Sequence, residues 1–205
     1  MSQPDEHFVY VAADDPRARF LLDDLTREYD SRYGDVFGES ADEEISRYPV
    51  ADFAPPRGAF VLLVRDGEPV AGGAFKPFGD DAVEFKRIWT SAAHRRQGLA
   101  RRVVAELEAE TLRRGISVVY LSTGPRQPEA VRLYGSAGYS PLFDESLTPD
   151  EIVIHGFAKS LDETPLDLDD IRRRHEESLA EFYDALPAEA SLGRSAAGIT
   201  EEVSA

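Results

Sequence analysis

The sequence predicts a mixed α/β fold: a mostly antiparallel, twisted sheet that contains a central parallel pair of strands and is flanked by helices. Three apolar runs, at residues 59–65, 69–78 and 82–90, are separated by the turn signals Asp66-Gly67 and FGDDA, which predicts three successive antiparallel strands. After the third run the apolar spacing changes from two residues to about 3.6. A continuous β-branched run follows at residues 116–123. A helix that crosses between two strands usually makes them parallel.

The remaining elements are expected on either side of this block. Before the hairpin we expect one strand and two helices, at residues 8–13, 15–29 and 42–48, with Asp14 or Asp15 as the N-cap of the first helix. After the third run we expect a helix that ends at Gly115, then the β-branched strand, then a short helix that ends at Gly138. Two final strands are expected at residues 139–142 and 152–161.

The charge distribution predicts a domain at residues 8–161 and an acidic C-terminal extension at residues 162–205. From Asp162 onward, twelve acidic residues face four arginines. The extension holds an amphipathic helix at about residues 167–186, because Leu168, Ile171 and Leu179 follow three-and-four spacing, and then a loose tail. The apolar face of this helix docks either on the domain or on a second subunit, so we expect a monomer or a homodimer.

Composition excludes several classes of function. The chain has no cysteine, which excludes disulfides, thiolate zinc sites and cysteine nucleophiles. Its four histidines lack ligand spacing, so no metal site is expected. No apolar run approaches the roughly 20 residues of a membrane span, and we expect a soluble, cytoplasmic protein without a membrane partner. A net charge of -16 opposes unspecific binding of nucleic acid and favours cationic small molecules or peptides.

One basic stretch, HRRQGLARR at residues 94–102, contrasts with this acidity. It lies between a predicted strand and the first turn of a predicted helix, where unpaired N–H groups and the helix dipole favour an anion. Gly98 permits close approach of the backbone, and the arginines can bind phosphate oxygens with forked hydrogen bonds. The stretch has neither the P-loop pattern nor the dinucleotide-binding glycines, so we expect a diphosphate site of another kind.

The pattern Arg95-x-x-Gly98-x-Ala100 resembles the pyrophosphate-binding loop of the GNAT superfamily of acyl-CoA-dependent N-acetyltransferases. VEFKRIWT before it and LSTGPRQPEAVRLYGSAGY after it resemble further segments of that family, in the same order. The resemblance covers about residues 8–161. It implies a GNAT-like acyl-CoA N-acyltransferase fold, acetyl-CoA as co-substrate without a metal, and acetyl transfer to a primary amine.

The resemblance also implies the residues that bind the donor. The backbone of Ile88, Trp89 and Thr90 pairs with the pantetheine arm. The diphosphate lies among the residues of the basic loop: Arg95, Arg96, Gln97, Gly98, Leu99, Ala100 and Arg101. The family often places an Asn that contacts pantetheine near the start of the following short helix. This chain has Arg126 and Gln127 there, so the resemblance implies that one of them, Gln127 in our assignment, takes over this contact.

Two residues match catalytic positions of the family. Glu84 corresponds to a general-base glutamate, and the alternative is an ion pair with Lys86 or with a neighbouring strand. Tyr134 corresponds to the tyrosine that assists the leaving thiolate, and the alternative is a core aromatic. Because cysteine is absent, we expect direct attack of the amine on the thioester, without a covalent enzyme intermediate.

The acceptor is expected to be a small-molecule or peptide amine. The segment REYDSRYGDVFGESADEE predicts an acidic entrance, with Asp30, Asp35 and Glu39, that favours a cationic amine; the alternative is that these carboxylates are only solvated. Two other functions remain open: a non-catalytic acyl-CoA-binding module or sensor, and generic nucleotide binding at the basic loop.

Overall fold

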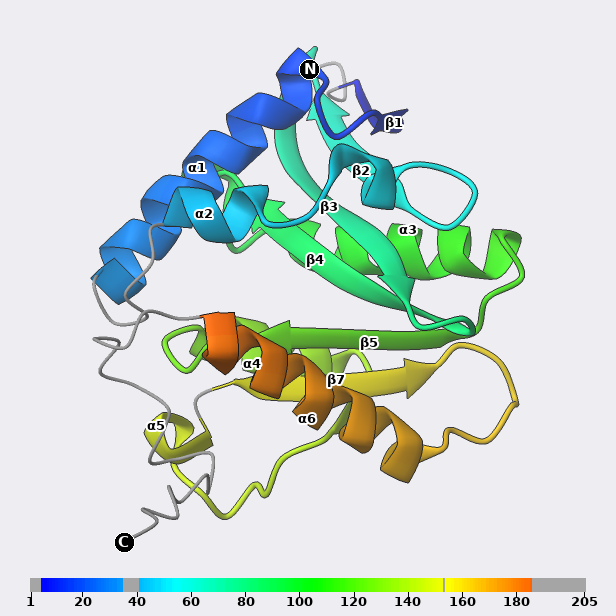
Figure 1. Ribbon diagram of the computed structural model, residues 1–205. Coiled ribbons are helices and arrows are strands. Elements are labelled where there is room, and N and C mark those ends of the chain that lie inside the picture. The colour runs from blue at the N-terminus through cyan, green and yellow to red at the C-terminus, as the bar shows by residue number, and fades with distance from the viewer. Residues whose placement is uncertain (1–4, 35–40, 153, 186–205) are drawn as a thin grey trace, which may run out of the picture.

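The computed structural model describes residues 5–34, 41–152 and 154–185 and contains a seven-stranded sheet (Figure 1). Along the sheet the strands are β1 (Glu6–Val11), β2 (Ala59–Arg65), β3 (Glu68–Phe78), β4 (Ala82–Thr90), β5 (Val118–Thr123), β7 (His155–Ser160) and β6 (Ser140–Pro141). Neighbouring strands are antiparallel except β4 and β5, which are parallel. The predicted mixed sheet with a central parallel pair is therefore confirmed.

Helices cover both faces of this sheet. In Figure 1, α1, α2 and α6 lie on one side, and α3 and α4 lie on the other. Their bounds are α1 (Pro16–Tyr33), α2 (Ala41–Ser46), α3 (Leu99–Arg113), α4 (Pro128–Ser136), a short α5 (Pro149–Ile152) and α6 (Leu168–Ala185), with 3-10 turns at Val50–Phe53 and Ala92–His94. Asp15 caps α1 as expected, because its carboxylate accepts a hydrogen bond from the Arg17 backbone N–H at 2.8 Å.

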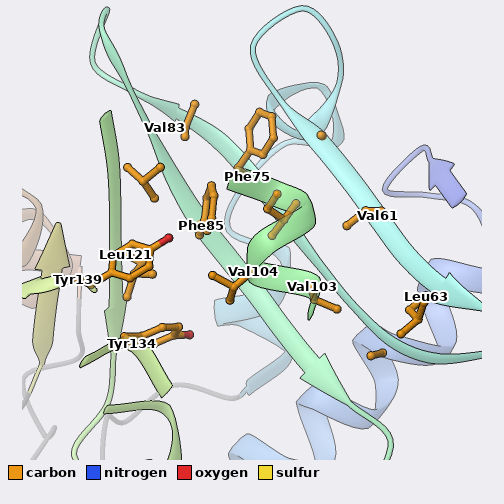
Figure 2. Packing of buried hydrophobic residues seen from close by; sticks show 14 of the residues in the cluster. Val61, Leu63, Phe75, Val83, Phe85, Val103, Val104, Leu121, Tyr134 and Tyr139 are labelled. Atoms are coloured by element: carbon orange, nitrogen blue, oxygen red, sulfur yellow. The ribbon is translucent and has the colours of Figure 1, made fainter. Parts of the chain in front are cut away.

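The central strands are apolar on both faces because each face has its own helical layer. In β2, Val61 and Leu63 pack in the cluster that includes Val103 of α3 (Figure 2). The alternate residues Phe60 and Leu62 pack in the cluster formed with α1. This two-sided burial explains why AFVLLV reads as a continuous apolar run rather than an alternating one.

Two adjacent glycines of β3 let the layers approach closely. A Cβ at Gly72 would lie 2.5 Å from Leu21 of α1, and a Cβ at Gly73 would lie 2.9 Å from Val103 of α3. Both separations are shorter than carbon atoms tolerate, so either substitution would force the neighbouring side chains to shift. The Gly-Gly pair therefore leaves room for Leu21 and Val103 to pack on the sheet beside the site described below.

A bulge in β4 opens the sheet. Gly72 pairs with Trp89 and Ala74 with Lys86, so Arg87 and Ile88 together oppose one residue of β3. Arg87 adopts φ of 60°, in the left-handed region. Such a bulge bends its strand and leaves backbone groups without ladder partners. The pairing of β4 with β5 accordingly stops at Phe85, and the two strands separate beyond it.

The helix of the C-terminal extension docks on the domain. Ile171 and His175 of α6 are buried, and the Tyr120 hydroxyl of β5 hydrogen-bonds the His175 Nδ1 at 2.7 Å. The His175 ring lies over Gly156 of β7, where a Cβ would approach it to 2.9 Å. Between the two alternatives for the apolar face of this helix, the structure shows docking on the chain's own sheet.

Most expected boundaries lie within three residues of those observed. The largest difference is α1, which continues to Tyr33, four residues beyond its expected end. The last strand begins at His155 and not at residue 152, because Ile152 ends the short helix α5. The Glu151 carboxylate accepts hydrogen bonds from the Thr148 backbone N–H and hydroxyl, which favours a helical turn there. In the described ranges, no helix is long and apolar enough to cross a membrane.

Candidate active site

A cavity of about 570 Å³ lies where β4 and β5 separate, beside the N-terminus of α3. We call it the donor cavity. Walls from α1 and α4 complete it. Ten of the eleven residues expected to bind the donor line it: Ile88, Trp89, Thr90, Arg95, Arg96, Gly98, Leu99, Ala100, Arg101 and Gln127. The exception is Gln97, whose side-chain oxygen accepts a hydrogen bond from Arg65 at 2.9 Å instead.

The backbone at the start of α3 is shaped for an anion. Gly98 is the N-cap with φ of 76°, a left-handed conformation that side chains disfavour, and no atom lies within 4 Å of where its Cβ would be. The first N–H groups of a 15-residue helix therefore face open space. The buried Thr90 hydroxyl nearby has no hydrogen-bond partner among the described residues. These features fit a diphosphate and a polar chain attached to it.

The arginines around this helix start are held by partners of the protein itself. Arg95 donates to the Glu28 carboxylate of α1 at 2.8 Å, and Arg101 donates to the Ser136 hydroxyl of α4 at 3.1 Å. The Arg95 side chain is still 45% exposed. A phosphate oxygen can therefore reach it by exchange with Glu28.

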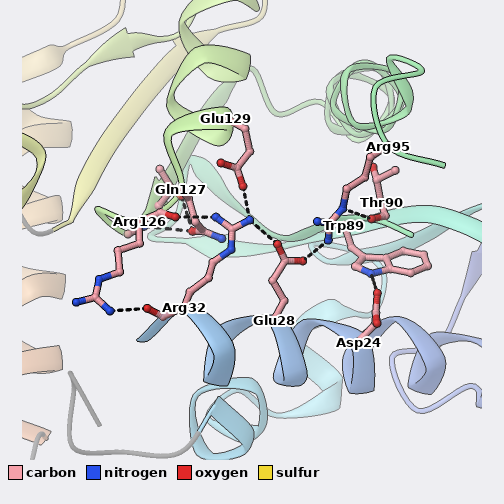
Figure 3. Close-up of polar contacts among 11 residues, drawn as sticks. Asp24, Glu28, Arg32, Trp89, Thr90, Arg95, Arg126, Gln127 and Glu129 are labelled. Carbon is pink, nitrogen blue, oxygen red and sulfur yellow. Dashed lines mark hydrogen bonds and ion pairs between the residues drawn. The ribbon is translucent and has the colours of Figure 1, made fainter. Parts of the chain in front are cut away.

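Ion pairs also connect α1 to α4 along the donor cavity (Figure 3). Arg32 pairs with Glu28 at 2.6 Å and with Glu129 at 2.5 Å. On the same helix, the Asp24 carboxylate accepts a hydrogen bond from the Trp89 indole at 2.7 Å. Sequence reasoning missed these α1 residues, although the four-residue spacing of Glu28 and Arg32 predicts a pair on one helix face.

A second, smaller cavity of about 180 Å³ adjoins the first. We call it the acceptor cavity. Its walls come from α1, α2, β4, β5, α4 and α6, and six aromatic rings are among its lining residues. Four residues line both cavities: Ile88, Gln127, Ala130 and Tyr134. A group in one cavity can therefore contact a group in the other at these residues.

Tyr134 lies at the junction of the two cavities. Its ring packs edge-on against Tyr139 and Phe157, with centroids 6.0 and 5.7 Å away, so it is a core aromatic. Its hydroxyl makes no hydrogen bond to any residue that the structure describes, and burial raises its pKa. A neutral O–H donor is thus available where the cavities meet.

Gln127 also lies at this junction, at the start of α4. Its side-chain oxygen accepts hydrogen bonds from the Thr123 hydroxyl at 2.6 Å and the Gly124 backbone N–H at 3.3 Å. These bonds leave its amide N–H groups to face the cavities. The other residue considered for this contact, Arg126, instead donates to the Arg32 backbone carbonyl at 2.6 Å.

Glu84 is buried beside these cavities but is not among the residues that line them. One carboxylate oxygen lies 3.1 Å from the Lys76 ammonium of β3, and the other lies 3.1 Å from the Lys86 ammonium. Its exposed fraction is 5%. This geometry matches the ion-pairing alternative stated for Glu84, which includes both Lys86 and a neighbouring strand.

The expected acidic entrance is partly described. Asp30 lines the acceptor cavity, whereas Asp35 and Glu39 lie outside the described residues. Two cations, Lys86 and Arg87, line the same cavity. The described lining is therefore not acidic as a whole.

Comparisons with known proteins agree with this geometry. The family model described as the acetyltransferase (GNAT) family matches residues 21–139. No curated protein matches the chain. An acetyltransferase of the GNAT family from Staphylococcus aureus Mu50 is 12% identical with a TM-score of 0.61, and the alignment covers 77% of this chain and 100% of that one.

Two further structures were solved with acetyl-CoA or coenzyme A. A protein from Salmonella typhimurium, solved with its cofactor acetyl-CoA, is 15% identical with a TM-score of 0.54, and the alignment covers 78% of this chain and 96% of that one. An aminoglycoside 6'-N-acetyltransferase complexed with coenzyme A is 17% identical with a TM-score of 0.55. That alignment covers 78% of this chain and 99% of the other. These likenesses support the fold, and the family match spans more than half of the sequence. The chain belongs to the GNAT family of acetyltransferases.

Proposed function

We propose that this acetyltransferase transfers the acetyl group of acetyl-CoA to the nitrogen of a primary amine, by direct attack and without a covalent enzyme intermediate. One observation carries the proposal: the donor cavity and the acceptor cavity meet at Tyr134, so a thioester in one faces an amine in the other. Holding two reactants together in this way supplies much of the rate of such reactions.

The residues of the donor cavity bind acetyl-CoA in this proposal. The diphosphate binds the first N–H groups of α3 beside Gly98, with Arg95, Arg96 and Arg101 neutralising its charge. The pantetheine arm lies along Ile88, Trp89 and Thr90, which lie beyond the last residue of β4 that pairs with β5, Phe85. The Gln127 amide donates to the polar part of that arm.

In the chemical step the amine nitrogen forms a bond to the acetyl carbon, the carbon–sulfur bond breaks, and the sulfur leaves as a thiolate. The Tyr134 hydroxyl hydrogen-bonds that sulfur. Since burial raises the pKa of Tyr134, full proton transfer to a thiolate of pKa about 8.5 is uphill. Its contribution is therefore a hydrogen bond from a buried side chain to the developing charge.

The amine must lose a proton to attack, because an alkyl ammonium with a pKa of about 10.4 is almost fully charged at pH 7. A base role for Glu84 requires a carboxylate oxygen that can reach the acceptor cavity, and both of its oxygens are in ion pairs. We therefore assign Glu84 a positioning role: it holds Lys86 against the cavity wall, while water in the cavity carries the proton away.

The experiment compares acetyl-CoA with ATP as stabilising ligands and then measures CoA release with a panel of amines. Acetyl-CoA at about a hundredfold excess over its dissociation constant should add about 2.7 kcal/mol to the free energy of unfolding. Stabilisation by acetyl-CoA with no CoA release from any amine would support the other function considered, a non-catalytic acyl-CoA-binding module. Equal stabilisation by ATP would support generic nucleotide binding.

A further inference from the structure

The acceptor cavity is lined by rings from several separate elements. Tyr29 and Tyr33 come from α1, Tyr48 follows α2, and Phe182 comes from α6 of the C-terminal extension. Tyr134 closes the end that faces the donor cavity. A cavity of about 180 Å³ with such walls suits a flat apolar group, because rings pack edge-on or offset against other rings.

The charges of this cavity do not favour a polycation. Asp30 is the lining carboxylate in the described part of the chain, and its Oδ1 already accepts the Ala41 backbone N–H at 3.3 Å. Lys86, which is paired with Glu84 at 3.1 Å, and Arg87 line the same cavity. Among the described lining residues, a second positive charge on the acceptor would therefore lie near two cations and one carboxylate.

Phe182 is held in place by contacts of its own. The Arg47 guanidinium lies over its ring, 5.1 Å from the centroid. The helix that carries it is anchored further along by the bond between Tyr120 and His175, and by the ion pair of Arg174 with Asp81 at 2.6 Å. α6 lies outside the segment that matches the family model, so this wall is a feature of the extension.

We infer that the acceptor is a primary amine carried on an apolar, ring-bearing body, and that Phe182 of the C-terminal helix contacts this body and selects for it. The inference rests on the proposed function of the same site and goes further by naming the acceptor class and the residue that determines it. Asp30 offers a carboxylate oxygen to the acceptor from the lining of the cavity. The amine nitrogen lies beside Tyr134, where the thioester arrives.

The experiment measures kcat/KM for three amines, 2-phenylethylamine, propylamine and spermidine, with the wild type and with Phe182→Ala. The wild type should prefer 2-phenylethylamine over both other amines by about tenfold or more, as expected when a ring packs among the aromatic side chains of the cavity. Phe182→Ala should lower that preference about tenfold and leave the KM for acetyl-CoA unchanged. Phe182→Leu, which keeps an apolar side chain under Arg47, should give an intermediate preference.

Glu181→Ala is the matched control, because this exposed neighbour on α6 is not among the cavity residues. It should leave every kinetic constant within twofold, and thermal unfolding checks that each variant stays folded. A preference for spermidine, or a preference that Phe182→Ala and Phe182→Leu leave unchanged, would overturn the inference.

Calorimetric binding of 2-phenylethylamine to the protein with CoA present separates this inference from the proposed function. Binding that Phe182→Ala weakens about tenfold, with no CoA release from acetyl-CoA, would reject the transfer reaction and retain the ring-binding site. No measurable binding together with no turnover of this amine would reject the ring-binding site itself.

Discussion

Replacing Glu84 by Gln tests whether this residue holds the site together or removes a proton. The substitution keeps the shape of the side chain and removes its charge, which leaves the ammonium groups of Lys76 and Lys86 without their shared partner. Removing one partner of a buried ion pair costs about 3–5 kcal/mol. The lysine side chains are 14% and 17% exposed, so we take the lower end, about 3 kcal/mol.

For a chain of 205 residues this loss should lower the melting temperature by roughly 6–12 °C. Urea unfolding at pH 7 measures the loss in the free energy of unfolding, and calorimetry at pH 7 measures the fall in melting temperature. Glu177→Gln is the matched control, because its ion pair with Arg173 has side chains 60% and 57% exposed. That control should cost at most about 1 kcal/mol.

Kinetics complete the test of Glu84. If Glu84 is a positioning residue, Glu84→Gln should change kcat/KM for the amine by less than about tenfold, and the rise of kcat/KM with pH should keep its shape. If Glu84 is a general base, the substitution should lower kcat/KM by about 10²–10⁴-fold. A kcat/KM loss of that size with unchanged stability would refute the positioning role. The double variant Glu84→Gln with Lys76→Met should lose less free energy of unfolding than the sum of the two single variants. The second substitution removes one of the two ammonium groups that shared the Glu84 carboxylate.

Three further outcomes are expected. Tyr134→Phe should lower kcat by about ten- to a hundredfold, because a hydrogen bond to the leaving sulfur is lost, while stabilisation by acetyl-CoA stays the same. Arg95→Ala should raise the KM for acetyl-CoA about tenfold or more with little change in kcat, since one charge-assisted bond to phosphate is lost. Burial lowers the pKa of His175 to about 4, so the unfolded chain takes up this proton first as the pH falls below about 6.5. Between pH 7.5 and pH 5 the free energy of unfolding of the wild type should therefore fall by about 2 kcal/mol because of this group. In urea unfolding, the fall over the same pH range should be about 2 kcal/mol smaller for His175→Gln than for the wild type.

The basic loop could be located from the sequence because its function depends on local features. Gly98 ends the approach to a helix, and the arginines flank it within a few positions, so spacing alone predicts an anion site. The structure brings these residues together with the bulged part of β4 because strand order and crossover follow general rules. Gln97 is the exception: its side chain turns to Arg65 of β2, a contact between residues far apart in the sequence.

The acceptor cavity could not be predicted in the same way. Its rings come from α1, from the segment after α2, from α4 and from α6, and no local pattern links Tyr29 to Phe182. The pairing of Glu28 with Arg95 likewise joins α1 to the basic loop across the sheet. Such contacts depend on how the layers pack, as at Gly72 of β3, where a Cβ would lie 2.5 Å from the Leu21 side chain of α1.

Under the proposed function, the ion pair of Glu28 with Arg95 at 2.8 Å suggests how an acidic chain binds an anionic donor. An arginine without a partner would attract any anion and would have to lose its water on binding. In the proposed donor complex the diphosphate replaces Glu28 as the partner of Arg95, so it does not meet an unpaired charge. Glu28 can then turn fully to Arg32, which it already contacts at 2.6 Å on the same helix. That helix also carries Tyr29, so the element that releases Arg95 to the donor is the one that forms a wall for the acceptor.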